Sequence, residues 1–320
     1  MLTQADALLK ATAKAAFWQN YESYPSIMAG LVAQVTSDSD QETYPWLAYA
    51  PGVREMTGSR VKRSVPELKW TIANKKWEST VSIPYETRKY ARLNSVQALL
   101  GSMGSKARAY PDKLTSTLLN NGLVAGNTAY DGQLFFSASH SEAQSSYTAA
   151  QSNYFAFAGT GSARKASDTW LDTEAAGAIN AARVALMSFK DGEGDPVMMN
   201  PGANILIMCP VDLYASLASL KTAATLTGGA ANPIVGTFDV IANPWLTPVP
   251  VLGSVLDYFY AFNTSGAHKP FIYQIAEAVG LEDDMGGDND FMSKDVSFGT
   301  FGYYNVGFGD WRYAVKVISS

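Results

Sequence analysis

The sequence predicts a mixed α+β protein, organised as one large domain or two coupled lobes. Apolar residues alternate with a period of two over residues 66–85, which predicts strands. Helical spacing of apolar residues predicts a long helix over 94–121, and short strand-like runs recur after residue 203. These strands are scattered among helices without the regular alternation of a doubly wound sheet. A chain of 320 residues can bury an ample core.

The N-terminal stretch predicts a short helix followed by extended chain. Residues 3–20 carry a partly apolar face, and Thr3 can cap the helix with Asp6 three residues later. Residues 21–51 mix turn formers with isolated apolar side chains. We expect this stretch to be extended, with no obvious partner nearby.

Two alternating runs at 66–72 and 77–85 predict a β-hairpin with a turn at 73–75. A lone two-stranded hairpin is only marginally stable in water. This hairpin therefore needs another surface to lie on, or a partner that covers it. The apolar residues predicted to make that contact are Trp70, Ile72, Trp77, Val81 and Ile83.

The later elements follow from the same rules. Pro111 interrupts the helix predicted over 94–121 and should kink it, and Gly122 lies where the helix should stop. A serine-rich excursion covers 137–168, and a further helix begins at Asp172 or Thr173. A buried strand at 203–209 leads through Pro210 into a helix. Strand-like runs are predicted at 234–241, 249–262, 270–276 and 310–318.

Composition restricts the class of function. The apolar fraction of 47% and the charged fraction of 17% are those of a globular protein, and no apolar run is long enough to span a bilayer. No secretory signal is predicted at the N-terminus. The formal charge of −5 argues against tightly held nucleic acid, although it is compatible with a wall that merely encloses DNA. The single cysteine, Cys209, lies in an apolar run and is expected to be a buried small hydrophobe in a reducing compartment.

Few residues suggest catalysis or ligand binding. His140 and Asp131 lie near a serine-rich loop and allow a Ser-His-Asp hydrolase to be imagined, but no Gly-x-Ser-x-Gly motif frames a nucleophile. The glycine pairs lack the Gly-Lys-Ser/Thr of a phosphate loop. An acidic loop around 282–290 could attract a cation, but its spacing does not match the twelve-residue calcium loop. We predict no catalytic residue, cofactor or metal site.

Charge is distributed unevenly between two segments. Residues 54–92 contain ten basic and four acidic side chains, a net +6, whereas 277–295 contain one basic and seven acidic side chains, a net −6. Both can be solvated surfaces, or the basic segment of one copy can meet the acidic segment of another. Complementary charges of this kind mainly fix register and speed encounter. The charged residues predicted to take part are Arg60, Lys62, Arg63, Lys75, Lys76, Asp283, Asp284, Asp288 and Asp290.

Several motifs, in a shared order along the chain, resemble those of the Mu-type phage major head subunit family. The N-terminal set is Tyr44-Pro45-Trp46-Leu47 with Pro51-Gly52-Val53-Arg54-Glu55, and the next runs from Trp70 to Val81. Tyr130-Asp131-Gly132-Gln133 with Phe135-Phe136 and His140 is similar to a central motif of the family, and Asn305 to Trp311 to its C-terminal strand. The resemblance thereby gives His140 a structural explanation.

The family implies the Hong Kong 97 (HK97-like) capsid fold. On that basis residues 1–50 are an N-terminal arm, 51–92 the extended hairpin called the E-loop, and 93–171 a peripheral domain with its spine helix at 94–121 and the surface excursion. Residues 172–290 are then an axial domain, and 291–320 are strands that return to the peripheral domain. Covalent cross-linking is not implied for any lysine of this chain.

The resemblance further implies a non-enzymatic structural protein of the virion. Copies are expected to form hexamers and pentamers of an icosahedral shell that is assembled in the bacterial cytoplasm and encloses double-stranded DNA without reading its sequence. Portal, scaffold and decoration proteins are expected partners, and a membrane is not. The alternatives are an encapsulin-like compartment, a soluble hydrolase using His140, and a carbohydrate-binding tail or adhesin module.

Overall fold

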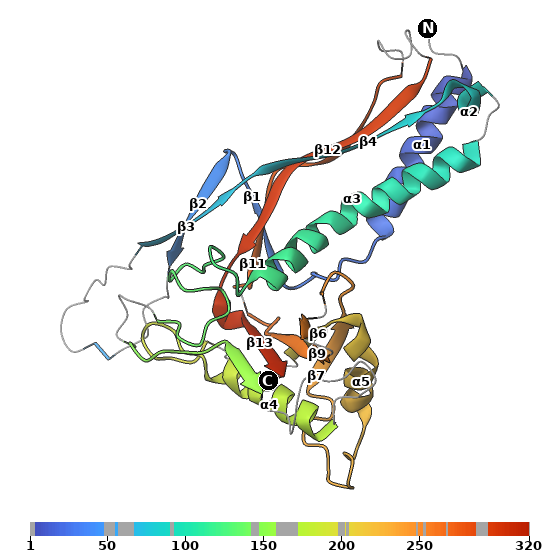
Figure 1. The fold of residues 1–320 in the computed structure, drawn as a ribbon. Coiled ribbons are helices and arrows are strands. Elements are labelled where there is room, and N and C mark those ends of the chain that lie inside the picture. The colour runs from blue at the N-terminus through green and yellow to red at the C-terminus, as the bar shows by residue number, and fades with distance from the viewer. Residues whose placement is uncertain are drawn as a thin grey trace.

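The computed structural model describes residues 4–47, 55–56, 67–89, 93–141, 147–157, 172–197, 202, 205–247, 249–251, 254–266, 268–285 and 294–319. These residues form an elongated lobe of helices and long strands above a compact lobe that contains the C-terminus (Figure 1). One large apolar core runs from the compact lobe into the base of the elongated lobe, and a second smaller core fills the far end of the elongated lobe.

A four-stranded sheet and two long helices build the elongated lobe. The strand order is β1-β11-β12-β4. The strand β1 runs parallel to β11, and the other neighbours are antiparallel. The elements are α1 (Gln4–Ser23), β1 (Val32–Thr36), β4 (Lys75–Ile83), α2 (Tyr85–Lys89), α3 (Leu93–Asn121), β11 (Phe271–Asp283) and β12 (Val296–Phe308).

The two long helices pack closely against each other and against the sheet. A Cβ atom at Gly104 of α3 would lie 2.3 Å from the carbonyl oxygen of Phe17 in α1, so only glycine permits this approach. Phe17 is fully buried among apolar side chains of α3 and of the strand ends, including Leu100 and Phe298. This packing makes α1 an integral part of the lobe in this conformation.

A five-stranded sheet forms the centre of the compact lobe. Its order is β5-β13-β10-β6-β7, and all five residues of β10 are buried. The elements are β5 (Tyr154–Phe157), α4 (Asp172–Ser188), β6 (Ile205–Cys209), α5 (Val211–Thr222), β7 (Phe238–Ala242), β10 (Tyr258–Phe262), the 3-10 turn η1 (Trp311–Tyr313) and β13 (Ala314–Ser319). A small separate ribbon pairs β8 (Val249–Val251) with β9 (Ser254–Leu256).

The prediction of a β-hairpin within 66–85 is wrong, although both of the predicted strands exist. The strand β3 (Glu67–Ala73) pairs with β2 (Gln41–Leu47), and β4 pairs with β12. Asn74 between them is buried rather than a turn, and its side-chain amide donates to the Ser37 hydroxyl and the Ser39 carbonyl at 2.9 and 2.8 Å. The turn before β2 therefore fixes the junction between β3 and β4. The pair of strands that projects from the elongated lobe is β2–β3 (Figure 1).

The strands of each sheet come from separate stretches of the chain. The strand β11 belongs to the sheet of the elongated lobe, whereas β5 and β13 pair in the sheet of the compact lobe. Each lobe is thus assembled from several separate stretches of chain, because its strands find their partners far away in sequence. The division into an N-terminal arm, E-loop, peripheral domain and axial domain stays a prediction.

The remaining helix predictions agree with the structure, but three predictions of extended chain do not. The stretch 21–51 contains β1, which pairs with β11, and the excursion 137–168 contains β5, which pairs with β13. The single run predicted at 249–262 is divided into β8, β9 and β10. The long helix α3 continues through Pro111, and α1, α4 and α5 lie where helices were expected. Leu213, Leu217 and Leu220 of α5 are buried. Cys209 is fully buried, and this burial raises the pKa of its thiol to about 12, as expected for an inert residue.

Candidate assembly surfaces

The apolar residues predicted to contact neighbouring copies lie on the two strands β3 and β4. Ile72 and Ile83 are 4% and 2% exposed, so their own subunit already covers them. Trp70, Trp77 and Val81 are half-buried and keep part of their surface. The idea that this whole segment lacks shelter on its own molecule is therefore wrong for the two isoleucines, and only the three half-buried residues remain available.

Trp77 is fixed by one hydrogen bond and two ring contacts. Its indole N–H donates to the carbonyl oxygen of Tyr304 at 2.9 Å, across the β4–β12 pair. Its ring lies 4.8 Å from that of Tyr110 in α3, and 6.4 Å from that of Tyr304. Such tilted aromatic pairs contribute beyond their buried area. Tyr304 itself is buried, and this burial raises the pKa of its hydroxyl.

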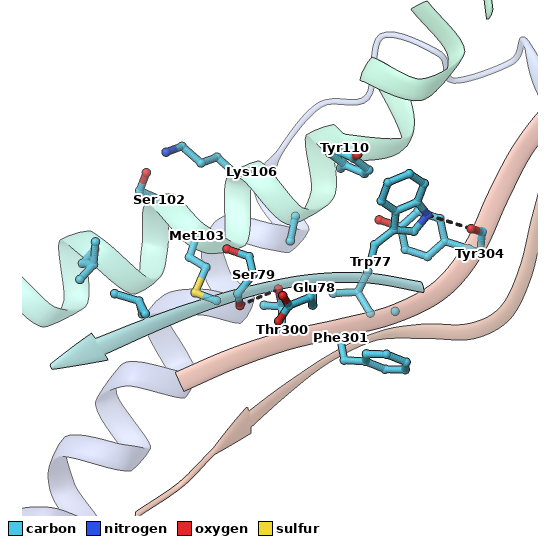
Figure 2. Close-up of a pocket in the computed structure, with 15 residues that line it drawn as sticks. Trp77, Glu78, Ser79, Ser102, Met103, Lys106, Tyr110, Thr300, Phe301 and Tyr304 are labelled. Atoms are coloured by element: carbon cyan, nitrogen blue, oxygen red, sulfur yellow. Dashed lines mark hydrogen bonds between the residues drawn. The ribbon is translucent and has the colours of Figure 1, made fainter. Parts of the chain in front are cut away.

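Trp77 forms one end of an apolar groove between α3 and the sheet (Figure 2). The groove has a volume of about 400 Å³. Its α3 wall carries Leu99, Ser102, Met103, Lys106, Ala107 and Tyr110, and its sheet wall includes Trp77, Val81, Val279 and Tyr304. Pockets of this size that are lined mainly by apolar and aromatic residues are typical binding sites.

The predicted basic residues are only partly described. Lys75 and Lys76 at the start of β4 are exposed, and the Lys76 ammonium lies 5.9 Å from the centre of the Tyr303 ring. Arg60, Lys62 and Arg63 lie outside the described residues. The two described lysines are thus open to solvent, as a contact with another copy would require.

The predicted acidic residues separate into different environments. The carboxylate of Asp283 is only 4% exposed and forms ion pairs with the ammonium groups of Lys10 and Lys14 of α1, at 2.7 and 3.0 Å. Burial alone would raise the pKa of Asp283, but the two lysines outweigh it and hold that pKa below its usual value. Asp283 therefore meets basic residues of its own subunit. Asp284 is half-buried, and Asp288 and Asp290 lie outside the described residues.

His140 belongs to a sealed structural cluster. The residue is fully buried, and its ring stacks on that of Trp311 at 4.0 Å with an angle of 5° between the planes. Its two ring nitrogens lie 2.7 Å from a carboxylate oxygen of Asp131 and 3.1 Å from the amide oxygen of Asn153. Both nitrogens thus have hydrogen-bond partners from their own chain, as expected for a structural histidine.

Two features of these surfaces were not foreseen from the sequence. The strand β12 was only partly anticipated, because its glycines interrupt the alternation that marks a strand. The groove was missed because its walls lie far apart in the chain. Only Leu99, Met103 and Tyr110, at helical spacing beside the alternating Trp77 and Val81, could have suggested it.

Comparison with known proteins identifies the family. The model of the Mu-like prophage major head subunit gpT family matches residues 7–166 and 251–319, which together make up well over half of the chain. The chain belongs to this family. The resemblance drawn from the scattered motifs is confirmed.

Two curated relatives support this assignment over part of their length. The major capsid protein of Escherichia phage Mu is 32% identical over 124 residues, which cover 39% of this chain and 40% of that protein. The Mu-like prophage FluMu major head subunit of Haemophilus influenzae is 29% identical over 116 residues, or 36% of this chain and 37% of that protein. The matched region thus spans about 40% of the length of these relatives.

Solved structures show the fold. The procapsid of bacteriophage JBD30 aligns with a TM-score of 0.56 at 22% identity, covering 97% of this chain and 73% of that one. The mature capsid of bacteriophage PhiM1 aligns at 0.57 with 11% identity, covering 93% and 88%. The virus-like particle from Pyrococcus furiosus aligns at 0.51 with 10% identity, covering 95% and 96%. The predicted HK97-like capsid fold is confirmed.

Proposed function

We propose that this chain is the major capsid protein of a tailed bacteriophage of the Mu type, whose copies assemble into hexamers and pentamers of an icosahedral shell around double-stranded DNA. The observation that carries the proposal is the match of the gpT family model to both the N-terminal and the C-terminal parts of the chain. A structural role without catalysis fits the sealed environment of His140.

The shape of the subunit supports a role in assembly. The β2–β3 hairpin and the elongated lobe both extend away from the compact lobe (Figure 1). Such extensions expose much surface for their mass and are stabilised when other copies cover them. Obligate interfaces bury about 2,000 Å² or more in total, and many weak contacts closing on one another add avidity.

Other expected partners rest on the same proposal. Portal, scaffold and decoration proteins would bind the assembled shell, which we place in the virion after assembly in the host cytoplasm. The enclosed DNA would be contained without base recognition, since the chain is acidic overall. None of the described helices combines the length and apolar character needed to cross a bilayer.

Electron microscopy of the purified full-length chain tests the proposal. We expect closed icosahedral particles. Changing the half-buried Trp70 and Trp77 together to Ser should leave folded subunits that fail to close into shells, because both lose apolar contact area. Normal particles from the double variant would show that this surface does not hold the shell, and a strictly monomeric wild-type chain would refute the proposed function.

The encapsulin-like alternative implies the same fold, but the match of the gpT family model favours the phage head. The content of the particles separates the two functions. A phage head produced during infection contains double-stranded DNA, whereas a protein compartment contains proteins. Nuclease-resistant DNA in purified particles would therefore support the phage head and exclude the protein compartment.

A further inference from the structure

The groove between α3 and the sheet has a cationic edge. Lys106 of α3 lines the groove and is exposed, and in Figure 2 its side chain projects from the helix away from the strands. Lys75 lies two residues before Trp77 and so points to the same face of β4. The Lys113 ammonium lies 5.8 Å from the centre of the Tyr110 ring, at the aromatic end of the groove. Within the described part of the chain, no carboxylate forms an ion pair with these three lysines.

Among the residues that line the groove, Glu78 is the single carboxylate. Glu78 lies along the groove, but its carboxylate accepts a hydrogen bond from the Thr80 hydroxyl at 3.3 Å. Residues 78 and 80 share the face of β4 opposite to that of Trp77 and Val81. An occupant that combines apolar side chains with carboxylates would therefore match both the lining and the edge.

The chain itself contains one segment of this composition. Between β11 and β12 the sequence reads Gly286-Gly287-Asp288-Asn289-Asp290-Phe291-Met292-Ser293, with two carboxylates next to two large apolar residues. The strand β11 ends at Asp283 and β12 begins at Val296, whereas the groove lies along the middle of β4. The register Val296↔Ile83, Phe298↔Val81 and Gly302↔Trp77 places the near end of the groove two residues from that end of the sheet, and its aromatic end six residues, or about 20 Å, from it.

We propose that the groove receives the acidic segment 286–293 of a second copy of this chain, with Phe291 and Met292 in the apolar cavity and Asp288 and Asp290 beside Lys75, Lys106 and Lys113. A volume of about 400 Å³ accommodates two large side chains. The charge pairs set the register of the contact, and the buried aromatic side chain contributes most of its binding free energy. This inference rests on the proposed shell-forming function, which requires contacts between copies.

Cysteine cross-linking in assembled particles tests the contact directly. The only native cysteine is buried, so it does not compete. Ser102→Cys at the exposed rim is combined with Phe291→Cys, and the control combines Tyr214→Cys, exposed on α5, with the same Phe291→Cys. After oxidation we expect several-fold more covalent dimer from the groove pair than from the control. Equal yields from intact particles would overturn the inference while leaving the proposed function in place.

Reversing the charges on both sides of the proposed contact provides a second test. Lys75→Glu with Lys106→Glu should lower particle yield about tenfold, in keeping with the coupling measured for close charge pairs at interfaces. Adding Asp288→Lys and Asp290→Lys to the same chain should restore most of it, because the pairs are re-formed with opposite sign. Normal assembly of the first variant, or no recovery in the second, would overturn the inference. A wild-type chain that forms no particles would instead refute the proposed function.

Discussion

The two lobes bury their sheets to different degrees. In the compact lobe every residue of β10 and the first four residues of β13 are buried, so both faces of the sheet are covered by the same chain. In the elongated lobe β4 has a single buried residue, Ile83, and β12 alternates buried with half-buried positions along most of its length. The compact lobe therefore holds together by its own packing, while the elongated lobe leaves half-covered surface for other copies. Mutations should affect stability in the first and assembly in the second.

Trp311→Ala in the compact lobe should have the largest effect on stability. Trp311 is fully buried, stacks on His140 and meets the Phe189 ring at 5.4 Å. Its removal leaves a large cavity and should cost about 4 kcal/mol of unfolding free energy. Urea unfolding of the unassembled subunit, followed by far-ultraviolet circular dichroism, measures this. Trp311→Phe is the matched control and should lose less, and equal losses would show that the cavity is not the cause.

Lys316→Met should stabilise the compact lobe at neutral pH. Lys316 is 5% exposed, and its ammonium lies 5.3 Å from the rings of both Tyr258 and Tyr260. Burial lowers the pKa of this amine from 10.5 to about 8. Below about pH 8 the folded state must therefore carry a buried charge, which costs up to about 3 kcal/mol at 1.4 kcal/mol per pH unit.

The sign of the pH dependence follows from the lowered pKa. Between pH 8 and 10.5 the unfolded chain keeps a proton that the folded chain has lost, so the stability contributed by this site rises with pH. The advantage of Lys316→Met over the wild type should accordingly be largest at pH 7 and shrink towards pH 10. Measuring the difference between the two proteins removes the titration of the tyrosines, which both share. A difference independent of pH would contradict the buried charge.

Trp77→Ala should affect assembly more than stability. Trp77 is half-buried and loses one hydrogen bond and its ring contacts with Tyr110 and Tyr304, so we expect about 2 kcal/mol of destabilisation. The subunit should remain folded, whereas particle yield should fall strongly. Comparison with Trp311→Ala by unfolding and by sedimentation sharpens the contrast between the lobes. The contrast would fail if Trp77→Ala destabilised the subunit as much as Trp311→Ala without affecting assembly.

The sequence could predict those elements whose signal is contained in one stretch of chain. The helices α3 and α5 were located because their apolar spacing is local. The strands β3 and β4 were located too, but their pairing was not, since β2 and β12 compete successfully with the short turn at Asn74. The contact surfaces depend on such distant partners throughout. The clearest case is Asp283, whose lysine partners in α1 lie about 270 residues earlier, so no local pattern could reveal it.

The loss of the two ion pairs between Asp283 and the lysines of α1 gives the smallest predicted effect, because both lysines are partly exposed to solvent. Asp283→Asn keeps the shape but removes the charge held by Lys10 and Lys14, which are themselves about one third exposed, so the loss should be about 1 kcal/mol at neutral pH. Because the pKa of Asp283 is lowered on folding, its contribution is present above the ordinary carboxyl pKa and disappears as the pH falls through the folded value. The wild type and Asp283→Asn should therefore converge in stability at acidic pH, and also in high salt, which screens the partly exposed pair. Convergence in urea unfolding would place the partner of Asp283 in its own α1. An effect on particle yield with no effect on subunit stability would instead place that partner in another copy.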